Sequence, residues 1–351
     1  MIDYTPFTIS ALMPASRPLF RDPVHDGAAD PVVVWNHLTA TWWMFYTNRR
    51  ANNPALPDIA WVHGTRLGIA ESRDGGATWI YRGMARIDLP SSPGPAAEIT
   101  HWAPEIVFNP ESATYHMYLT VVPGVFTDWQ HPRDLIHLTS PDLETWTYRS
   151  TLALTSDRVI DACVLRLPSG RWRLWYNDER AGKAINAAES DDLYHWIDLG
   201  LVPLPDRRPG EGPKVFRFAD AFWMIVDEWR GQAVYRSTDA RNWTRQTGDN
   251  LLAHDGAGPD DTGVGAHADV VVNDGRAWIF YFTHPARRTS GPAPAAAAYA
   301  GAAAADPNLR RSTIHVAELV LSADGRLVCD RDAPARIRLL PPSAIPVAPS
   351  I

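Results

Sequence analysis

The stretch Ser140-Pro141-Asp142-Leu143-Glu144-Thr145-Trp146 is one of four related stretches in this chain, each a Ser-x-Asp turn followed by a tryptophan. The other three are Ser72-Arg73-Asp74-Gly75-Gly76-Ala77-Thr78-Trp79, Ser190-Asp191-Asp192-Leu193-Tyr194-His195-Trp196 and Ser237-Thr238-Asp239-Ala240-Arg241-Asn242-Trp243. A shorter fifth copy, Ser322-Ala323-Asp324-Gly325, lies near the C-terminus. The aspartates of successive copies are 68, 50, 47 and 85 residues apart, and the shorter gaps are close to the length of one four-stranded propeller blade. The repeat therefore predicts five similar units.

Three strand-like segments precede each copy of the turn in the same order. The first is apolar and rich in β-branched residues, the second is aromatic, and the third leads into the turn. The apolar segments are 31–35, 105–108, 162–167, 213–218 and 269–272, and the aromatic segments are 42–47, 115–120, 172–177, 222–227 and 277–282. The third segments are 66–70, 135–139, 184–188, 232–236 and 313–319. Because no long stretch has a helical period, we predict an all-β fold, a five-bladed β-propeller.

We expect one catalytic domain over residues 1–351, with blades from about residue 29 to 328. The Ala/Gly/Pro-rich segment 289–306 is predicted to be a flexible insertion in the last blade. The net charge of −7, without a stripe of Lys and Arg, argues against a nucleic-acid partner. The apolar stretches are only strand-length, which argues against a membrane span.

The N-terminal residues lack a basic start followed by an apolar run, so we expect no secretory signal. Only two cysteines occur, Cys163 and Cys329, which fits a reducing compartment. The predicted location is therefore cytoplasmic. The sequence leaves the oligomeric state open.

The first strand of each propeller blade lines the central channel, and its entry end opens onto the face where ligands bind. The residues at this point of the five apolar segments are Asp30, Trp102, Asp161, Glu211 and His267. A single aspartate before a strand is more often a turn residue, but three carboxylates at corresponding points favour a functional site. Their mutual repulsion raises at least one pKa, so that one acid stays protonated while another is ionised. Paired carboxylates of this kind carry out glycoside hydrolysis.

Further candidates lie where the aromatic segments end. Asn177 and Arg180 are candidates for binding sugar hydroxyls, with a surface salt bridge as the equal alternative for Arg180. The pair Asp227-Glu228, at the corresponding point of the fourth unit, is a rival pair of carboxylates. His101, next to Trp102, is also a candidate for substrate binding.

Four short motifs resemble glycoside hydrolase family 43 and its five-bladed relatives over roughly residues 29–328. They are Asp30-Pro31, Trp102-Ala103-Pro104-Glu105, Ile160-Asp161-Ala162 and Glu211-Gly212-Pro213. A related family that acts on neoagaro-oligosaccharides also has a Trp-Ala-Pro segment, so membership among these relatives stays open. The Asn-Asp-Pro-Asn start and the Glu-Cys pair of the fructan-cleaving relatives are absent from this sequence.

The resemblance implies an inverting hydrolase with Asp30 as the general base and Glu211 as the general acid. Asp161 would tune the pKa of the acid and hold its orientation, and Trp102 would pack against the sugar. His267 would lie under the sugar, often near a bound calcium ion in this family. Because calcium prefers oxygen ligands, any contact between His267 and the metal would run through water. No cofactor is required by this chemistry.

The expected activity is the release of terminal arabinofuranosyl or xylosyl sugars from plant-type oligosaccharides. Three alternatives remain. One is a carbohydrate-binding propeller without catalysis, which would keep Trp102 and His267. Another is a related glycosidase acting on other oligosaccharides, such as algal galactan. The third is a scaffold for protein interaction.

Overall fold

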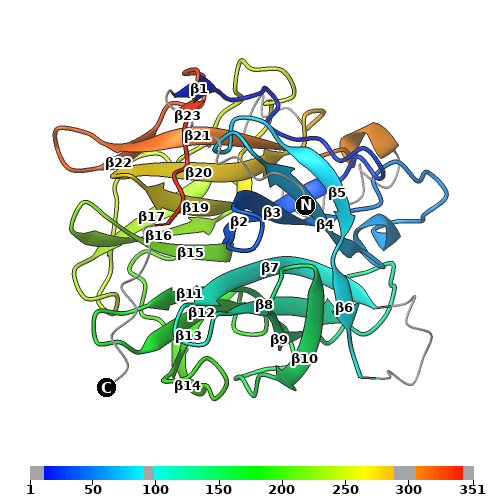
Figure 1. The fold of residues 1–351 in the computed structure, drawn as a ribbon, viewed down its shortest axis with the longest axis horizontal. Helices are drawn as coiled ribbons and strands as arrows, with labels where there is room; N and C mark the ends of the chain where they lie inside the picture. Colours follow the sequence, from blue (N-terminus) through cyan, green and yellow to red (C-terminus); the bar gives the residue numbers. More distant parts are fainter. Residues whose placement is uncertain (1–11, 91–98, 288–305, 343–351) are drawn as a thin grey trace.

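The structure is a computed structural model that describes residues 12–90, 99–287 and 306–342. These residues form five sheets of four or five strands, placed around a common axis, and a two-stranded ribbon (Figure 1). The ribbon pairs β1 (Met13–Pro14) with β23 (Arg336–Ile337), so it joins the two ends of the described chain.

Each blade is built from strands that are consecutive in the sequence. Blade 1 contains β2 (Ala28–Asn36), β3 (Thr41–Asn48), β4 (Arg66–Ser72) and β5 (Ile80–Met84). Blade 2 contains β7 (Thr100–Asn109), β8 (Thr114–Val122), β9 (Asp134–Ser140) and β10 (Thr145–Thr151), with β6 (Arg86–Asp88) added parallel to β10. Blade 3 contains β11 (Val159–Arg166), β12 (Trp172–Asp178), β13 (Ala184–Ser190) and β14 (Ile197–Leu201). Blade 4 contains β15 (Glu211–Phe218), β16 (Ala221–Asp227), β17 (Gln232–Ser237) and β18 (Thr244–Arg245). Blade 5 contains β19 (Ala266–Asn273), β20 (Arg276–Thr283), β21 (Thr313–Leu321) and β22 (Leu327–Cys329).

The first strands of the five blades form a closed ring. β2 contacts β7, β7 contacts β11, β11 contacts β15, β15 contacts β19, and β19 returns to β2. The helical elements within the described ranges are the short 3-10 turns η1 (Ala60–Val62) and η3 (Pro307–Leu309). The predicted all-β, five-bladed propeller is therefore confirmed. None of the helices in this part of the chain is long and apolar enough to cross a membrane.

Apolar side chains fill the spaces between the blades. Five clusters of buried residues each join two neighbouring blades, including the first and the last. The largest fully buried side chains include Trp43, Trp146, Trp175, Trp223 and Trp278. Among the described residues the sheets share no hydrogen-bonded ladder with one another, so burial of apolar surface is a major force that holds the ring closed.

The repeated turn is stabilised by its own side chains. In the second copy the Ser140 hydroxyl donates to Asp142 Oδ1 at 2.9 Å, and this oxygen also accepts the backbone N–H groups of Glu144 and Thr145. The Trp146 indole then donates to the carbonyl of Leu143 at 3.2 Å. Asp192 and Asp239 make the same serine and backbone contacts in the next two copies. The motif is thus a structural turn on the outer part of each blade.

Each inner strand has an irregular register at the same point, where the site lies. The pairing with the second strand shifts between Ala29 and Val32, Trp102 and Glu105, Ile160 and Cys163, Glu211 and Lys214, and Ala266 and Asp269. Bulges of this kind turn a side chain away from its regular direction and are frequent beside active sites.

The register corrects one prediction from the sequence. Asp30, Asp161 and His267 are each the first residue of a bulge. Trp102 and Glu211 instead lie one residue earlier, as the last paired residue before the bulge. The residues that truly correspond to Asp30 are Ala103 and Gly212. The five predicted residues are therefore not five versions of one position. The predicted correspondence was wrong by one residue in blades 2 and 4, because the small residues Ala103 and Gly212 occupy the start of the bulge there.

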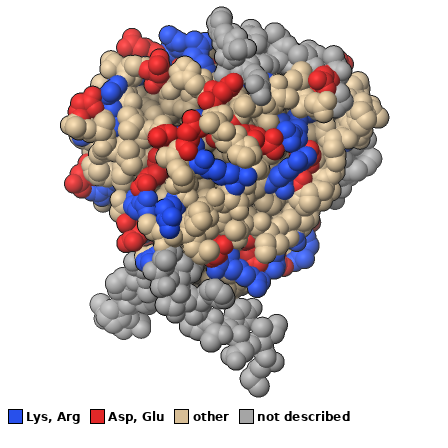
Figure 2. All heavy atoms as spheres, turned by 90° about the horizontal axis from the view of Figure 1, so that it is seen from above, with Lys and Arg blue, Asp and Glu red and all other residues tan. Residues whose placement is uncertain are grey.

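The predicted insertion 289–306 lies outside the described residues except for Asp306. On the face drawn in Figure 2, acidic and basic side chains are interspersed, and no extended basic patch is seen there among the described residues.

Candidate active site

Two buried carboxylates from different blades approach one imidazole. Nδ1 of His267 lies 3.8 Å from Oδ1 of Asp30 and 3.9 Å from Oδ1 of Asp161. Exposed fractions of the side chains rise from 7% for Asp30 and Asp161 to 16% for His267 and 27% for Glu211. Three inner strands thus bring three carboxylates close to one another, and Glu211 is the most exposed of them.

Backbone geometry fixes the two aspartates. Asp30 and Asp161 have φ values of 50° and 60°, in the left-handed region that few residues other than glycine adopt. The N–H of Asp161 donates to Thr120 Oγ1 at 3.1 Å, and its Oδ2 accepts the N–H of Gly212 at 2.9 Å. Strain of this kind costs about 1–3 kcal/mol per residue and is typical of functional sites.

The surroundings of Asp161 favour its protonated form. Burial raises the pKa of its carboxyl well above the ordinary value, and the charges of Glu211 and Asp30 raise it further. The N–H of Gly212 acts in the opposite direction but is the weaker influence. The three carboxylates therefore interact strongly enough to titrate as a group.

Glu211 is held by two side chains that the sequence did not indicate. The indole N–H of Trp229 donates to Glu211 Oε1 at 3.0 Å, and Nζ of Lys183 lies 3.6 Å from Oε2. Lys183 also contacts Glu179 at 2.6 Å and lies over the Trp229 ring at 5.0 Å. These contacts orient Glu211 while leaving it more exposed than the two aspartates.

Asp30 is paired with Arg49, which follows the end of β3. Nη2 of Arg49 donates to both carboxylate oxygens, at 3.1 and 3.2 Å. The guanidinium lies over the Phe282 ring at 4.8 Å and near His284 Nε2 at 3.4 Å. Nothing in the sequence placed this arginine on Asp30.

Gly212 is required by the packing of His267. A Cβ atom at Gly212 would lie 2.6 Å from Cδ2 of the imidazole, and the φ of this residue is +59°. Both the close approach and the left-handed backbone favour glycine. The imidazole therefore rests directly on the backbone next to Glu211.

The rival pair Asp227-Glu228 has structural contacts instead. Asp227 accepts the backbone N–H groups of Trp229 and His267, at 2.7 and 2.8 Å, and burial together with the charge of Glu211 raises its pKa to about 8. Glu228 is buried and pairs with Arg245 at 2.6 Å. Asp227 thus positions His267, and Glu228 is engaged elsewhere.

Trp102 and His101 are the two candidate residues from blade 2. The Trp102 indole donates to the Val62 carbonyl at 2.6 Å, and the guanidinium of Arg133 lies over its ring at 5.4 Å. His101 is 3% exposed, and burial together with the charge of Arg66 lowers its pKa to about 3, so its ring is neutral. Exposed Trp129 lies 6.0 Å from Trp102 between ring centroids, which extends the aromatic surface.

Asn177 and Arg180 have different surroundings. Asn177 is fully buried, and neither atom of its amide has a hydrogen-bond partner among the described residues. It pairs in register with Ile160, next to Asp161. Arg180 is half-exposed and forms an ion pair with Asp157, with Nη2 and Oδ2 2.7 Å apart. The structure therefore places Asn177 beside the carboxylates and gives Arg180 a surface ion pair.

The donor set around His267 does not fit a directly bound metal ion. No three His, Cys, Asp or Glu side chains within the described ranges are grouped so as to hold one. The calcium contact through water expected for His267 remains a prediction.

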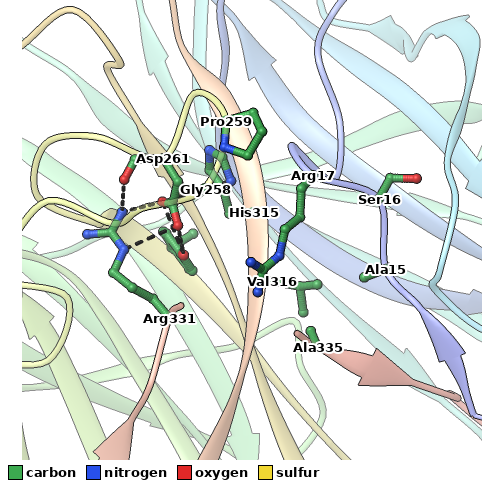
Figure 3. A pocket seen from close by; sticks show the side chains of 11 residues that line it. Ala15, Ser16, Arg17, Gly258, Pro259, Asp261, His315, Val316, Arg331 and Ala335 are labelled. Carbon is green, nitrogen blue, oxygen red and sulfur yellow. Dashed lines mark hydrogen bonds and ion pairs between the residues drawn. The ribbon is translucent and has the colours of Figure 1, made fainter. Parts of the chain in front are cut away.

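A small pocket lies elsewhere, where the N-terminal segment meets blade 5 (Figure 3). Arg331 points toward Asp261, with which it forms an ion pair. Tyr281 also donates to Asp261, at 3.0 Å. These polar groups satisfy one another, so the pocket is part of the scaffold that joins the chain ends.

The comparisons with known proteins support the fold. No family model and no curated protein matches the chain. A β-1,3-galactosidase of glycoside hydrolase family 43, solved with galactodeoxynojirimycin, is 12% identical with a TM-score of 0.60, covering 90% of this chain and 97% of its own. A family 43 enzyme from Xanthomonas citri, solved with xylotriose, is 14% identical with a TM-score of 0.61, covering 90% and 92%.

A β-xylosidase/α-arabinofuranosidase of family 43 from a compost metagenome, solved in a calcium-free form with xylotriose, is 12% identical with a TM-score of 0.59. The match covers 91% of this chain and 96% of that one. At these identities the likeness establishes the fold. The chain has the five-bladed fold of the family 43 structures, which confirms the resemblance at that level.

Proposed function

We propose that this protein is an inverting glycoside hydrolase that releases terminal arabinofuranosyl or xylosyl sugars from plant-type oligosaccharides. The observation that carries the proposal is the approach of Asp30 and Asp161 to His267, with Glu211 at the more exposed side of the same group. Inverting glycosidases need one carboxylic acid for the leaving oxygen and one carboxylate for a water molecule.

Asp30 is proposed as the general base. A carboxylate has about four lone-pair sites, and the two contacts from Arg49 leave others free to accept a proton from water. Arg49 fixes the plane of the carboxylate, so the attacking water would be held in one direction. Such positioning is a major part of catalysis by general bases.

Glu211 is proposed as the general acid, with Asp161 as its partner. The larger exposure of Glu211 fits a group that protonates the oxygen between the terminal sugar and the rest of the oligosaccharide. Asp161 is buried and anchored by the N–H of Gly212, the residue after Glu211. It would hold this segment in place and adjust the charge felt by the acid.

The terminal sugar would contact Asn177 and Trp102. Asn177 offers a buried donor and acceptor for hydroxyl groups, and the face of Trp102 offers an apolar surface. The ion pair of Arg180 with Asp157 supports the salt-bridge alternative for that residue. Both cysteines are free thiols, which supports the proposed cytoplasmic location and an imported oligosaccharide as substrate.

A panel of nitrophenyl glycosides tests the activity and the sugar. It should contain the α-L-arabinofuranoside, the β-D-xyloside and the β-D-galactoside, because solved structures of this fold include enzymes of each kind. Proton NMR of the first-formed sugar should show the inverted anomer. Preference for the galactoside would favour the galactan alternative, and calorimetric sugar binding without product would favour the non-catalytic alternative.

Variants test the roles of the two carboxylates. Asp30→Asn should lower kcat by roughly 10²–10⁴-fold on every substrate. Glu211→Gln should show a similar loss on natural oligosaccharides but a smaller loss on dinitrophenyl glycosides, whose leaving group needs little protonation. Circular dichroism and the melting temperature would establish that both variants are folded. Near-normal turnover by both would show that the assignment is wrong.

A further inference from the structure

A lysine, Lys214, lies in the inner ring of the propeller, directly after the bulge of blade 4. The corresponding residues of the other inner strands are Val32, Glu105, Cys163 and Asp269. Only 14% of the Lys214 side chain is exposed, and Glu105 and Asp269 are 5% and 4% exposed. A charged triad thus occupies a layer otherwise filled by small or apolar side chains.

Lys214 joins the two carboxylates directly. Its Nζ lies 2.9 Å from Oε2 of Glu105 and 2.7 Å from Oδ1 of Asp269. Burial disfavours the ammonium charge, but Asp269 and Glu105 together hold the pKa of Lys214 well above its ordinary value. The ammonium is therefore a permanent cation between two buried carboxylates.

The remaining oxygens of the triad reach the other two blades. Oε1 of Glu105 accepts the N–H of Val164 in blade 3 at 2.9 Å, and Oδ2 of Asp269 accepts the N–H of Val33 in blade 1 at 2.8 Å. Lys214, Glu105 and Asp269 belong to blades 4, 2 and 5. One ammonium and two carboxylates therefore connect all five inner strands just beyond the bulges that carry Asp30 and Asp161.

We infer that the ammonium of Lys214 is the structural cation of this propeller axis and that it takes the place of a divalent metal ion there. Two carboxylates that face each other across an axis are good oxygen ligands for calcium, but here the ammonium lies between them. Replacing the lysine with a small residue should convert the triad into a divalent-cation site. The inference stands on these contacts and does not depend on the proposed glycosidase activity.

The first experiment uses the unaltered protein. Its melting temperature and its circular dichroism spectrum are measured after dialysis against EDTA and again after addition of millimolar CaCl₂ or MgCl₂. Neither treatment should change either quantity. A fall after EDTA that calcium reverses would overturn the inference, because the axis would then depend on a metal. This arm decides the matter even if no variant can be purified in folded form.

The second experiment removes the ammonium. Lys214→Ser leaves two buried carboxylates without their cation, so the melting temperature should fall by roughly 5 °C. Calcium should restore much of this loss, and calorimetry should detect one calcium ion per chain. The matched control is Lys214→Ser combined with Glu105→Gln and Asp269→Asn, which should not respond to calcium. An equal calcium response in both variants, or none in either, would contradict the inference.

Discussion

Replacing Arg49 with methionine should damage both the stability and the activity of this protein. Arg49 and Asp30 are 18% and 7% exposed, and Nη2 of Arg49 lies 3.1 and 3.2 Å from the two carboxylate oxygens of Asp30. Breaking a buried pair of this kind costs about 3–5 kcal/mol, because the remaining charge is left without a partner. With about 2.1 cal/mol/K of unfolding entropy per residue over 351 residues, this corresponds to a fall of roughly 4–7 °C in melting temperature.

The effect on catalysis has a separate cause. Without Arg49 the Asp30 carboxylate is free to rotate, so it no longer holds the attacking water in one direction. We expect kcat to fall by roughly 10²-fold with a smaller change in KM, because the substrate itself still binds. Arg49→Lys should be intermediate, since an ammonium keeps the charge but cannot reproduce the planar contacts of the guanidinium.

Arg180→Met is the matched control, because it removes the same group from an ion pair at the surface. The Arg180 and Asp157 side chains are 49% and 51% exposed, so solvent screens their interaction. Its melting temperature and kcat should stay close to those of the parent protein. The assays are differential scanning calorimetry and initial rates on the best nitrophenyl glycoside. Equal effects of Arg49→Met and Arg180→Met on kcat would refute the assigned role of Arg49.

Three other perturbations have defined outcomes. His116 and His137 form a buried pair in which Nδ1 of His116 lies 2.9 Å from Nε2 of His137. Burial lowers their pKa values to about 4 and about 3. Because the unfolded chain binds these protons near pH 6.5, stability should fall as the pH drops from 7 to 5, by roughly 2 kcal/mol per histidine. Urea unfolding at both pH values should show a smaller fall in the free energy of unfolding for the His116→Gln/His137→Gln variant than for the parent protein. An equal fall in the two proteins would contradict this. Gly212→Ala should displace the His267 ring and lower kcat strongly, as initial rates would reveal, and an unchanged kcat would count against the close packing. Asn177→Ala should raise KM more than it lowers kcat, and a KM equal to that of the parent would exclude Asn177 from sugar binding.

The fold could be predicted because its signal is local. Each Ser-x-Asp turn is stabilised by contacts within a few residues, such as those of Ser140 and Asp142, so the same short pattern recurs wherever the turn is needed. Counting these turns gave the number of blades, and the alternation of apolar and aromatic segments gave the order of strands. Contacts that close the ring, such as that between β19 and β2, then follow from the number of blades.

The site could be predicted only in part, because its register is set by a backbone irregularity. Asp30 and Asp161 were placed correctly in their bulges, but the corresponding residues of blades 2 and 4 are Ala103 and Gly212. Small residues carry no chemical signal, so the adjacent Trp102 and Glu211 were aligned in their place. A positive φ cannot be read from an alanine or an aspartate in advance.

Partners from distant parts of the chain were missed for a different reason. Arg49 contacts Asp30, which lies 19 residues earlier, and Trp229 contacts Glu211, which lies 18 residues earlier. Each partner follows the end of the second strand of its blade. Their identity depends on how the strand ends converge. Lys214 was the easiest of the missed residues to recognise, because a lysine in an inner strand must pair with carboxylates once it is buried.

The inner strands carry two layers of charged side chains, an inner layer of Lys214, Glu105 and Asp269 and an outer layer of Asp30, Asp161 and Glu211. The two layers differ in how many of their carboxylate oxygens are engaged and in their exposure to solvent. In the inner layer every carboxylate oxygen of Glu105 and Asp269 is engaged by Lys214 or by backbone N–H groups. In the outer layer the exposed fraction rises from 7% at Asp30 to 27% at Glu211. A rigid inner layer would fix the strands, so that the base lies deep and the acid near the mouth. In the proposed mechanism, a sugar would place its terminal ring against Asp30 and its linking oxygen beside Glu211, an arrangement that favours the release of terminal sugars over cleavage within a chain.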